Sequence, residues 1–185
     1  MQLNKESLLR RILPKIKNFG DIGSYQGYKL SAVMVIIYFR GLEPFIVLIK
    51  RSSNMEYHRN EIAFPGGTYT NHDRVLINTA IRETKEEIGL LINKKDILGH
   101  IDITKTLTTN FIIFPFITIQ DSIPRTIVLT DEVSDILHIS LLDLFKTFEQ
   151  NDLITQNNLQ FMYRDNIIWG ATARIIQKLL DYIFN

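Results

Sequence analysis

The hydrophobic positions of this chain recur with two different spacings. Residues 31–39 (SAVMVIIYF) and 44–50 (PFIVLIK) are continuous apolar runs rich in β-branched side chains, with an arginine, a glycine and a glutamate between them. Such short runs are typical of buried strands, and neither is long enough to cross a bilayer. They predict a pair of strands joined by the turn around Gly41.

The second spacing is helical and begins in the middle of the chain. The side chains that recur there every three or four residues are Ile77, Ala80, Ile81, Thr84 and Ile88. This spacing marks the buried stripe of an amphipathic helix, which Gly89 would end. The same pattern near the C-terminus predicts a closing helix, whose apolar residues are Ile175, Ile176, Leu179, Leu180 and Ile183.

The whole pattern predicts a mixed order of helices and strands. A leading helix is followed by strands, a glycine turn, the central helix, further strands, an acidic loop with a short helix, a strand at 161–169 and the closing helix. This order is typical of the α/β (mixed α+β) class. The length of 185 residues suits one domain, residues 1–185, with an accessory helix at about 1–20; residues 151–158 are the most loop-like late segment.

Composition and charge exclude several classes of partner. The chain has no cysteine, which excludes disulfides and thiolate metal sites and is compatible with a cytoplasmic location. The formal net charge of +1 gives no global field for nucleic acid or an anionic membrane, so we predict neither partner. Residues 1–19 lack the continuous apolar core of a signal peptide.

The candidate chemistry lies on the central helix. Glu83, Glu86 and Glu87 share a face away from the apolar stripe, with Arg82 one turn before Glu86. Like charges at this spacing destabilise a helix by about 0.2–0.5 kcal/mol per pair, so the cluster is either a solvated acidic face or a cation site. Oxygen ligands without cysteine or histidine favour Mg²⁺ or Mn²⁺ over zinc. These ions support hydrolysis of a diphosphate.

A glycine turn stands upstream of this helix. The β-prone residues 61–64 (EIAF) end at Pro65, Gly66 and Gly67. Proline lacks a backbone donor and glycine permits positive φ, so the strand must stop in a tight turn. Its bare backbone allows close approach to a phosphate or a metal ion.

Residues 67–90 resemble the Nudix box, written G-x5-E-x7-R-E-U-x-E-E-x-G-U with U aliphatic. The residues that match at the required spacing are Arg82, Glu83, Glu86, Glu87, Gly89 and Leu90. Thr84 stands at an aliphatic position, and Asp73 replaces the first glutamate, with one extra residue before Arg82. Both departures resemble the boxes of coenzyme A pyrophosphatases, as do residues 108–116, 129–144 and 166–176; Glu56 and Asn60 stand where that subfamily has an arginine and a glycine.

The resemblance implies a fold and a site. The fold would be a mixed sheet sandwiched between helices. Glu83, Glu86, Glu87 and the Gly67 carbonyl would hold Mg²⁺ or Mn²⁺, and Arg82 would orient the carboxylates. The general base would be a box glutamate or Glu132, for which capping or surface charge is the equal alternative.

The resemblance also implies a substrate. It would be coenzyme A or an acyl derivative, cleaved to 3′,5′-ADP and 4′-phosphopantetheine. The alternatives are another nucleoside diphosphate derivative, such as ADP-ribose, a dinucleotide or a nucleoside triphosphate, and a Nudix-fold binding protein without turnover. A homodimer is compatible with the family.

Several other residues are weaker candidates. The cations that either meet substrate phosphates or are simply solvated are Arg51, Arg59, Lys105 and Arg125. We expect His58 to be structural and Asp73 to cap or precede the box helix. Trp169, in an apolar segment, is expected in the core rather than as a stacking platform for a base.

Overall fold

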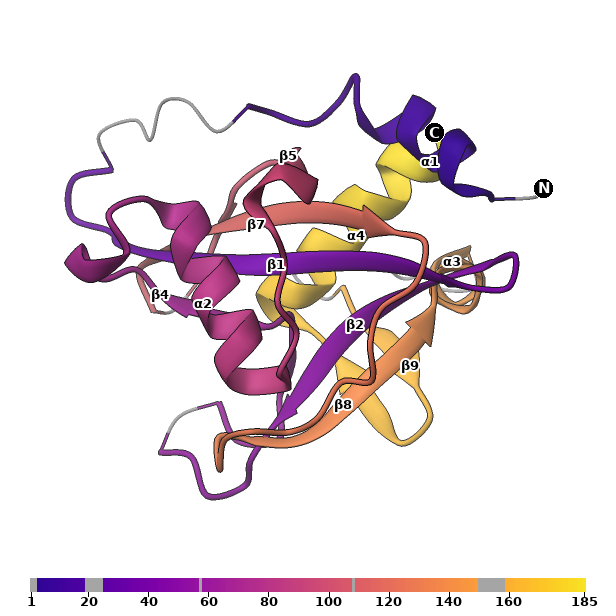
Figure 1. Cartoon of the computed structure of the whole chain (residues 1–185). Helices are drawn as coiled ribbons and strands as arrows, with labels where there is room; N and C mark the ends of the chain where they lie inside the picture. The colour runs from indigo at the N-terminus through magenta and orange to yellow at the C-terminus, as the bar shows by residue number, and fades with distance from the viewer. Residues whose placement is uncertain (1–2, 19–24, 57, 108, 150–158) are drawn as a thin grey trace.

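The computed structural model describes residues 3–18, 25–56, 58–107, 109–149 and 159–185 (Figure 1). In chain order the elements are α1 (Lys5–Ile12), β1 (Lys29–Arg40), β2 (Glu43–Arg51), β3 (Ile62–Ala63), β4 (Gly66–Thr68), a 3₁₀ turn (Asn71–Asp73), α2 (Leu76–Ile88), a 3₁₀ turn (Lys94–Asp96), β5 (Ile97–His100), β6 (Thr104–Lys105), β7 (Phe111–Gln120), β8 (Val133–Ser140), α3 (Leu141–Glu149), β9 (Phe161–Tyr163), β10 (Asn166–Ile168) and α4 (Gly170–Phe184).

The long strand β1 lies at the centre of a mixed sheet. Five strands follow the order β3-β2-β1-β7-β5, while β4 pairs with β1, β6 with β7 and β8 with β2. β1 runs parallel to β7 and antiparallel to both β2 and β4. The predicted pair of strands around Gly41 is confirmed, because β1 and β2 form a hairpin that pairs Arg40 with Glu43.

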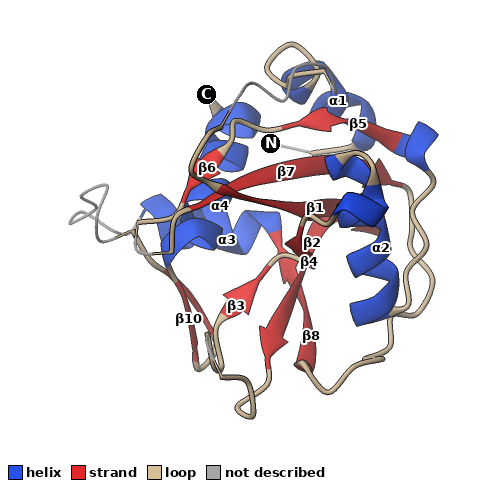
Figure 2. Cartoon of the chain, turned by 90° about the vertical axis from the view of Figure 1, so that its left-hand side faces the viewer, coloured by secondary structure: helices blue, strands red, loops and turns tan. Residues whose placement is uncertain are grey.

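The sheet is covered by helices on both faces. Side chains alternate along β1, so Val35 and Ile37 join one buried cluster with residues of α1, α3 and α4, whereas Met34 and Ile36 join another with residues of α2. Figure 2 shows α2 on one side of the strands and α4 on the other. The predicted fold class, a mixed sheet sandwiched between helices, is confirmed.

The leading helix is short and docks on the closing helix. The Asn4 side chain accepts a hydrogen bond from the Ser7 N–H at 2.8 Å and so caps the start of α1. The helix ends at Ile12, two residues before Pro14. Arg11 donates through Nη1 to the Ile183 carbonyl at 2.8 Å. The helical part of the expected accessory segment is therefore eight residues long.

Two predicted segments differ from the structure. The expected acidic loop and short helix contain an additional strand, β8, which pairs along β2 from Val133 to Ser140 before α3 begins. The expected single strand at 161–169 is a hairpin, because Arg164 turns the chain at φ 52° between β9 and β10. Both outcomes depend on pairing between strands, which local pattern does not specify. The predicted loop at 151–158 lies outside the described residues.

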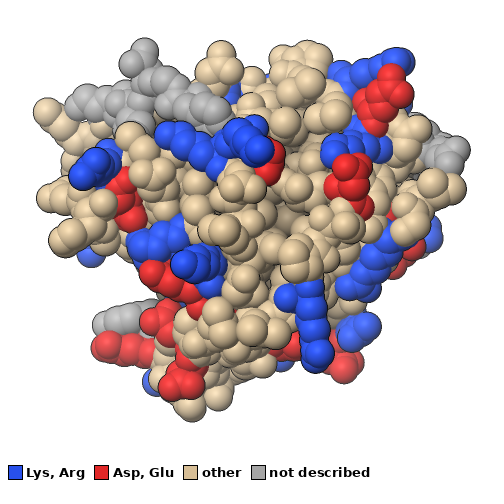
Figure 3. Space-filling view, in the orientation of Figure 1, with Lys and Arg blue, Asp and Glu red and all other residues tan. Residues whose placement is uncertain are grey.

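The surface agrees with the balanced composition. Figure 3 shows basic and acidic side chains interspersed on the visible face. Within the described ranges, no helix combines the length and apolar character that a bilayer crossing needs.

Candidate active site

The glycine turn brings backbone against both the sheet and a carboxylate. Gly66 has φ 155°, and a Cβ atom there would lie 2.6 Å from Cα of Val33 in β1. Its N–H donates to Oε2 of Glu87 at 2.9 Å. A Cβ atom at Gly67 would lie 2.5 Å from Cδ of Glu83. Gly66 therefore requires glycine, because a side chain would displace the strand, whereas a side chain at Gly67 would displace the Glu83 carboxylate.

Arg82 forms ion pairs with three carboxylates of the site. Its Nε and Nη2 donate to the two oxygens of Asp73 at 2.8 and 3.2 Å. Its Nη1 lies 2.8 Å from Oε1 of Glu83 and 2.9 Å from Oε2 of Glu86. This network fits the predicted orienting role of Arg82, which stays a prediction.

Asp73 has a larger role than the expected cap. Its carboxylate is only 4% exposed and also accepts hydrogen bonds from the Thr70 N–H and the Thr79 hydroxyl at 3.1 and 2.9 Å. The hydrogen bonds from Arg82 hold the pKa of Asp73 well below its ordinary value. Asp73 thus anchors the guanidinium that reaches Glu83, a contact that sequence reasoning missed.

Two of the three predicted glutamates are withdrawn from solvent. Glu87 is 4% exposed, and burial, with the charge of Glu83 as a smaller cause, raises its pKa to about 8 against the Gly66 hydrogen bond. Burial likewise raises the pKa of Glu83, although Arg82 opposes the shift. A carboxyl that titrates near neutral pH beside a second carboxylate is a common feature of functional sites.

Glu86 is more exposed than the other two glutamates. Its side chain is 53% exposed and is held by Arg82. Among the residues that the structure describes, no three carboxylate or imidazole groups stand together as a set of metal ligands. Glu87 differs from Glu86 in being buried, because the glycine turn closes over it.

Arg51 and Glu132 also belong to the site. Arg51 ends β2, and its Nη2 lies 3.9 Å from Oε2 of Glu132. The Glu132 carbonyl accepts from the Ser52 N–H at 2.8 Å, so backbone pairing holds Glu132 beside β2 while its side chain stays 60% exposed. The buried Nε of Arg51 has no hydrogen-bond partner within the described part of the chain.

These groups line one cavity of about 760 Å³, a volume typical of small-molecule sites. The turn, Glu83, Glu87, Arg51 and Glu132 belong to its lining. The larger apolar side chains of the same lining are Leu107, Phe111, Ile113, Leu159 and Trp169. The cavity therefore combines carboxylates with apolar side chains.

Trp169 corrects a sequence-based expectation. Rather than packing in the core, it is 50% exposed and lines the cavity beside Arg174. It directly precedes Gly170, at which α4 begins with φ 65°. The strand-to-helix transition thus places the indole at the rim of the cavity.

The remaining candidates lie at or outside this rim. His58 lines the cavity and pairs with Glu61, with 3.0 Å between Nδ1 and Oε2. Asn60, which stands where the subfamily has a glycine, adopts a left-handed conformation with φ 58°. Glu56 is exposed and does not line the cavity. The Nζ atom of Lys105 lies 4.9 Å from the centre of the Tyr28 ring.

Comparison with known proteins identifies the family of this chain. The sequence model of the NUDIX domain matches residues 28–156, which is well over half of the chain. The chain therefore belongs to the Nudix family and is a hydrolase of pyrophosphate bonds. It is 28% identical over 142 residues to the uncharacterized Nudix hydrolase NudL of Pectobacterium atrosepticum, covering 74% of this chain and 73% of that protein.

Solved structures share the fold at low sequence identity. The NUDIX domain of Shewanella oneidensis NrtR, complexed with ADP ribose, matches with a TM-score of 0.62 and 13% identity over 97% of this chain and 98% of that one. A bifunctional NMN adenylyltransferase/ADP ribose pyrophosphatase from Francisella tularensis, complexed with AMP and a manganese ion, matches with a TM-score of 0.51 and 17% identity over 64% of this chain and 36% of that one.

Substituting Gly67 tests the close approach of turn and carboxylate. In Gly67→Ala we expect roughly 100-fold lower turnover, because the new Cβ displaces Glu83 by about an ångström. The substitution should also lower the melting temperature in the wild-type background but have little further effect in Glu83→Ala, where the clash is absent. Equal effects in both backgrounds would show that the contact does not matter.

The raised pKa of Glu87 predicts how stability depends on pH in EDTA. The unfolded carboxyl ionises near 4.5 and the folded one near 8. Between these values the folded state binds more protons, so stability falls as pH rises through this window. At about 1.4 kcal/mol per pKa unit, the wild type should lose roughly 2–4 kcal/mol more than Glu87→Gln between pH 5 and 8. Parallel denaturation curves would contradict the burial argument.

Proposed function

We propose that this protein is a divalent-metal-dependent pyrophosphatase that cleaves coenzyme A or its acyl derivatives to 3′,5′-ADP and 4′-phosphopantetheine. The observation that carries the proposal is the burial of the Glu83 and Glu87 carboxylates against the Gly66–Gly67 turn, in a cavity that combines carboxylates with apolar side chains.

The donor set fits a hard cation. Glu87 is buried beside Glu83, and within the described residues no lysine, arginine or histidine lies within 4.0 Å of its oxygens. Burying such a carboxylate in its ionised form is costly unless a cation accompanies it. We propose that Glu83, Glu86, Glu87 and the Gly67 carbonyl supply oxygen ligands to Mg²⁺ or Mn²⁺. When bound, the ion would neutralise diphosphate oxygens and activate the attacking water.

The surrounding residues would position the diphosphate. Arg82, anchored by Asp73, orients Glu83 and Glu86. Arg51, which lines the same cavity, would donate to a phosphate oxygen. The proton of the attacking water goes to a box glutamate or to Glu132, which lies beside Arg51.

The cavity lining supports a substrate with an apolar arm. Leu107 and Phe111 in this lining suit a pantetheine or acyl chain, and Arg174 suits an additional phosphate monoester. The exposed position of Glu56 outside the lining removes its charge from direct contact with substrate. The second candidate is another nucleoside diphosphate derivative, because the half-exposed face of Trp169 suits any nucleobase.

A substrate panel tests the proposal. The protein is incubated with Mg²⁺ and then Mn²⁺ in the presence of coenzyme A, ADP-ribose, NADH or a nucleoside triphosphate at equal concentration, and products are identified by chromatography and mass spectrometry. Preferential release of 3′,5′-ADP from coenzyme A is the expected result. Preference for another substrate would remove the coenzyme A assignment, and equal turnover in EDTA would remove the metal.

A further inference from the structure

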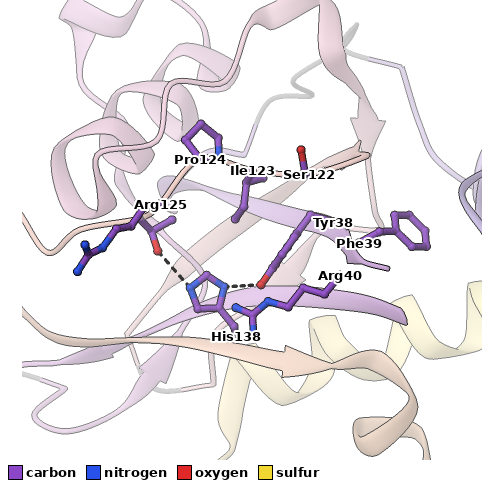
Figure 4. Close-up of a pocket in the computed structure, with 9 residues that line it drawn as sticks. Tyr38, Phe39, Arg40, Ser122, Ile123, Pro124, Arg125 and His138 are labelled. Atoms are coloured by element: carbon purple, nitrogen blue, oxygen red, sulfur yellow. Dashed lines mark hydrogen bonds between the residues drawn. The ribbon is translucent and has the colours of Figure 1, made fainter. Parts of the chain in front are cut away.

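A second cavity lies at the other end of β1 (Figure 4). Residues 31–33 of β1 pair with the glycine turn, whereas Tyr38, Phe39 and Arg40 line this cavity of about 480 Å³. At about 3.3 Å per residue, the nearest residues of these two groups, Val33 and Tyr38, are roughly 17 Å apart along the strand. The opposite walls are formed by the loop at 122–126 and by His138 of β8. The two cavities share no lining residue.

The floor of this cavity is a hydrogen-bonded chain. His138 lies 2.8 Å from the Tyr38 hydroxyl through Nδ1 and 3.1 Å from the Thr126 hydroxyl through Nε2. The Tyr163 hydroxyl donates to the backbone carbonyl of His138 at 3.3 Å. Burial, aided by the charge of Arg40, lowers the pKa of His138. The imidazole is therefore neutral near pH 7, and the charge of the cavity comes from its arginines.

Two guanidinium groups give the cavity a positive charge. The Arg40 guanidinium carbon lies 4.8 Å from the centre of the Phe45 ring and 5.5 Å from that of Tyr38. Figure 4 shows the Arg40 guanidinium beside the His138 ring, whereas the Arg125 side chain extends away from that ring. No aspartate or glutamate lines the cavity, and in the described part of the chain no carboxylate lies within 4.0 Å of either guanidinium.

We propose that this cavity is a second binding site, for a small molecule that carries a phosphate or carboxylate group. Arg40 and Arg125 would bind the anion, and the hydroxyls of Ser122 and Thr126 lie in the same lining. Aromatic contacts hold Arg40 in place, so its planar fork of donors is partly organised before an anion arrives. Ile123 and Pro124 offer an apolar surface to the rest of the ligand.

Arg40 and Arg125 are both exposed, but Arg40 has contacts that a simple solvated charge lacks. It stands over two aromatic rings at the edge of a concave site whose hydroxyl and imidazole groups are already ordered. The site depends on neither the box glutamates nor the proposed substrate.

Site-resolved NMR titration tests this proposal. Inorganic phosphate, adenosine monophosphate and citrate are added separately to the metal-free protein, which separates phosphate from carboxylate binding. The backbone amides of Ile123 and Thr126 and the His138 ring report on the second cavity, while the Trp169 indole N–H reports on the candidate active site. At least one anion should shift the first set of signals in a saturable way.

Variants then test whether Arg40 and Arg125 bind the anion. Arg40→Gln and Arg125→Gln should each weaken binding in the second cavity about tenfold or more, because each removes charge-assisted hydrogen bonds. Arg164→Gln is the matched control, since Arg164 also lies over a tyrosine ring, at 5.2 Å from Tyr163, but outside this cavity. Shifts confined to the Trp169 region, no saturable shifts, or unchanged affinity in both cavity variants would overturn the proposal.

Discussion

Glu87→Gln should abolish measurable pyrophosphatase turnover while leaving the fold intact. Glutamine matches the shape of the buried carboxyl and can still accept from the Gly66 N–H, but it cannot supply a negative oxygen to a cation. We expect turnover to fall at least about 100-fold, the scale on which metal-orienting and acid–base groups act. The measurement is the steady-state rate with Mg²⁺ on the best substrate of the panel, with circular dichroism as the check on folding.

Two further variants make this result specific. Glu86→Gln should also lose turnover, although the side chain of Glu86 is more exposed than that of Glu87. Glu6→Gln is the matched control, because Glu6 forms an exposed pair with Arg10 on α1, far from the cavity lining; it should retain the wild-type rate. Rates near wild type in both Glu86→Gln and Glu87→Gln would remove the box glutamates from the site.

Asp73→Asn should cost about 2–4 kcal/mol of folding stability, because it leaves the anchored Arg82 without its buried counter-charge. In a chain of this length each kcal/mol corresponds to about 2–4 °C in melting temperature. The loss should be largest above pH 4, where the lowered pKa of Asp73 contributes its full stability. This contribution disappears as pH falls below the ordinary carboxyl pKa of 3.8 toward the lower folded value. Thermal denaturation across pH measures both effects.

The control for this substitution is an exposed ion pair. Asp121 lies 2.8 Å from Lys5 but is 83% exposed, so Asp121→Asn should change stability by less than about 1 kcal/mol. A melting temperature for Asp73→Asn as high as that of Asp121→Asn would show that the Asp73–Arg82 contact is dispensable. Retained turnover with reduced stability would restrict Asp73 to a structural role.

The sequence predicted those parts of the molecule that local pattern determines. The spacing of Ile77, Ala80 and Ile88 located α2, and the glycine pair located the turn that meets it. Both elements are determined by residues close together in the sequence. The helix α2 follows from its apolar stripe, and the turn follows from the backbone freedom of its glycines. The family resemblance then supplied the layers of the fold, which periodicity only permitted.

The missed features depend on contacts between distant segments. β8 pairs with β2 across more than 80 residues of chain, and no local period distinguishes it from the following helix. The sequence predicts only that Asp73 caps or precedes the box helix. Its bond to Arg82 could not be predicted, because it forms only when the intervening turn folds back. Trp169 looked apolar in sequence, but the start of α4 turns it to the cavity. The one feature of the sequence that pointed to a role for Asp73 in the site was its place near the missing first glutamate of the box.

The 3₁₀ turn at Asn71–Asp73 has a consequence for recognising related chains. The extra residue between Gly67 and Arg82 falls in the segment that holds this turn, where Arg74 takes φ 64° before α2 begins. The contact of Gly67 with Glu83 is nevertheless kept. A search pattern that fixes the number of residues between the box glycine and the box arginine would overlook such a chain. A pattern that lets this number vary, and requires the glycine to lie against the first glutamate of the helix in space, would retain it.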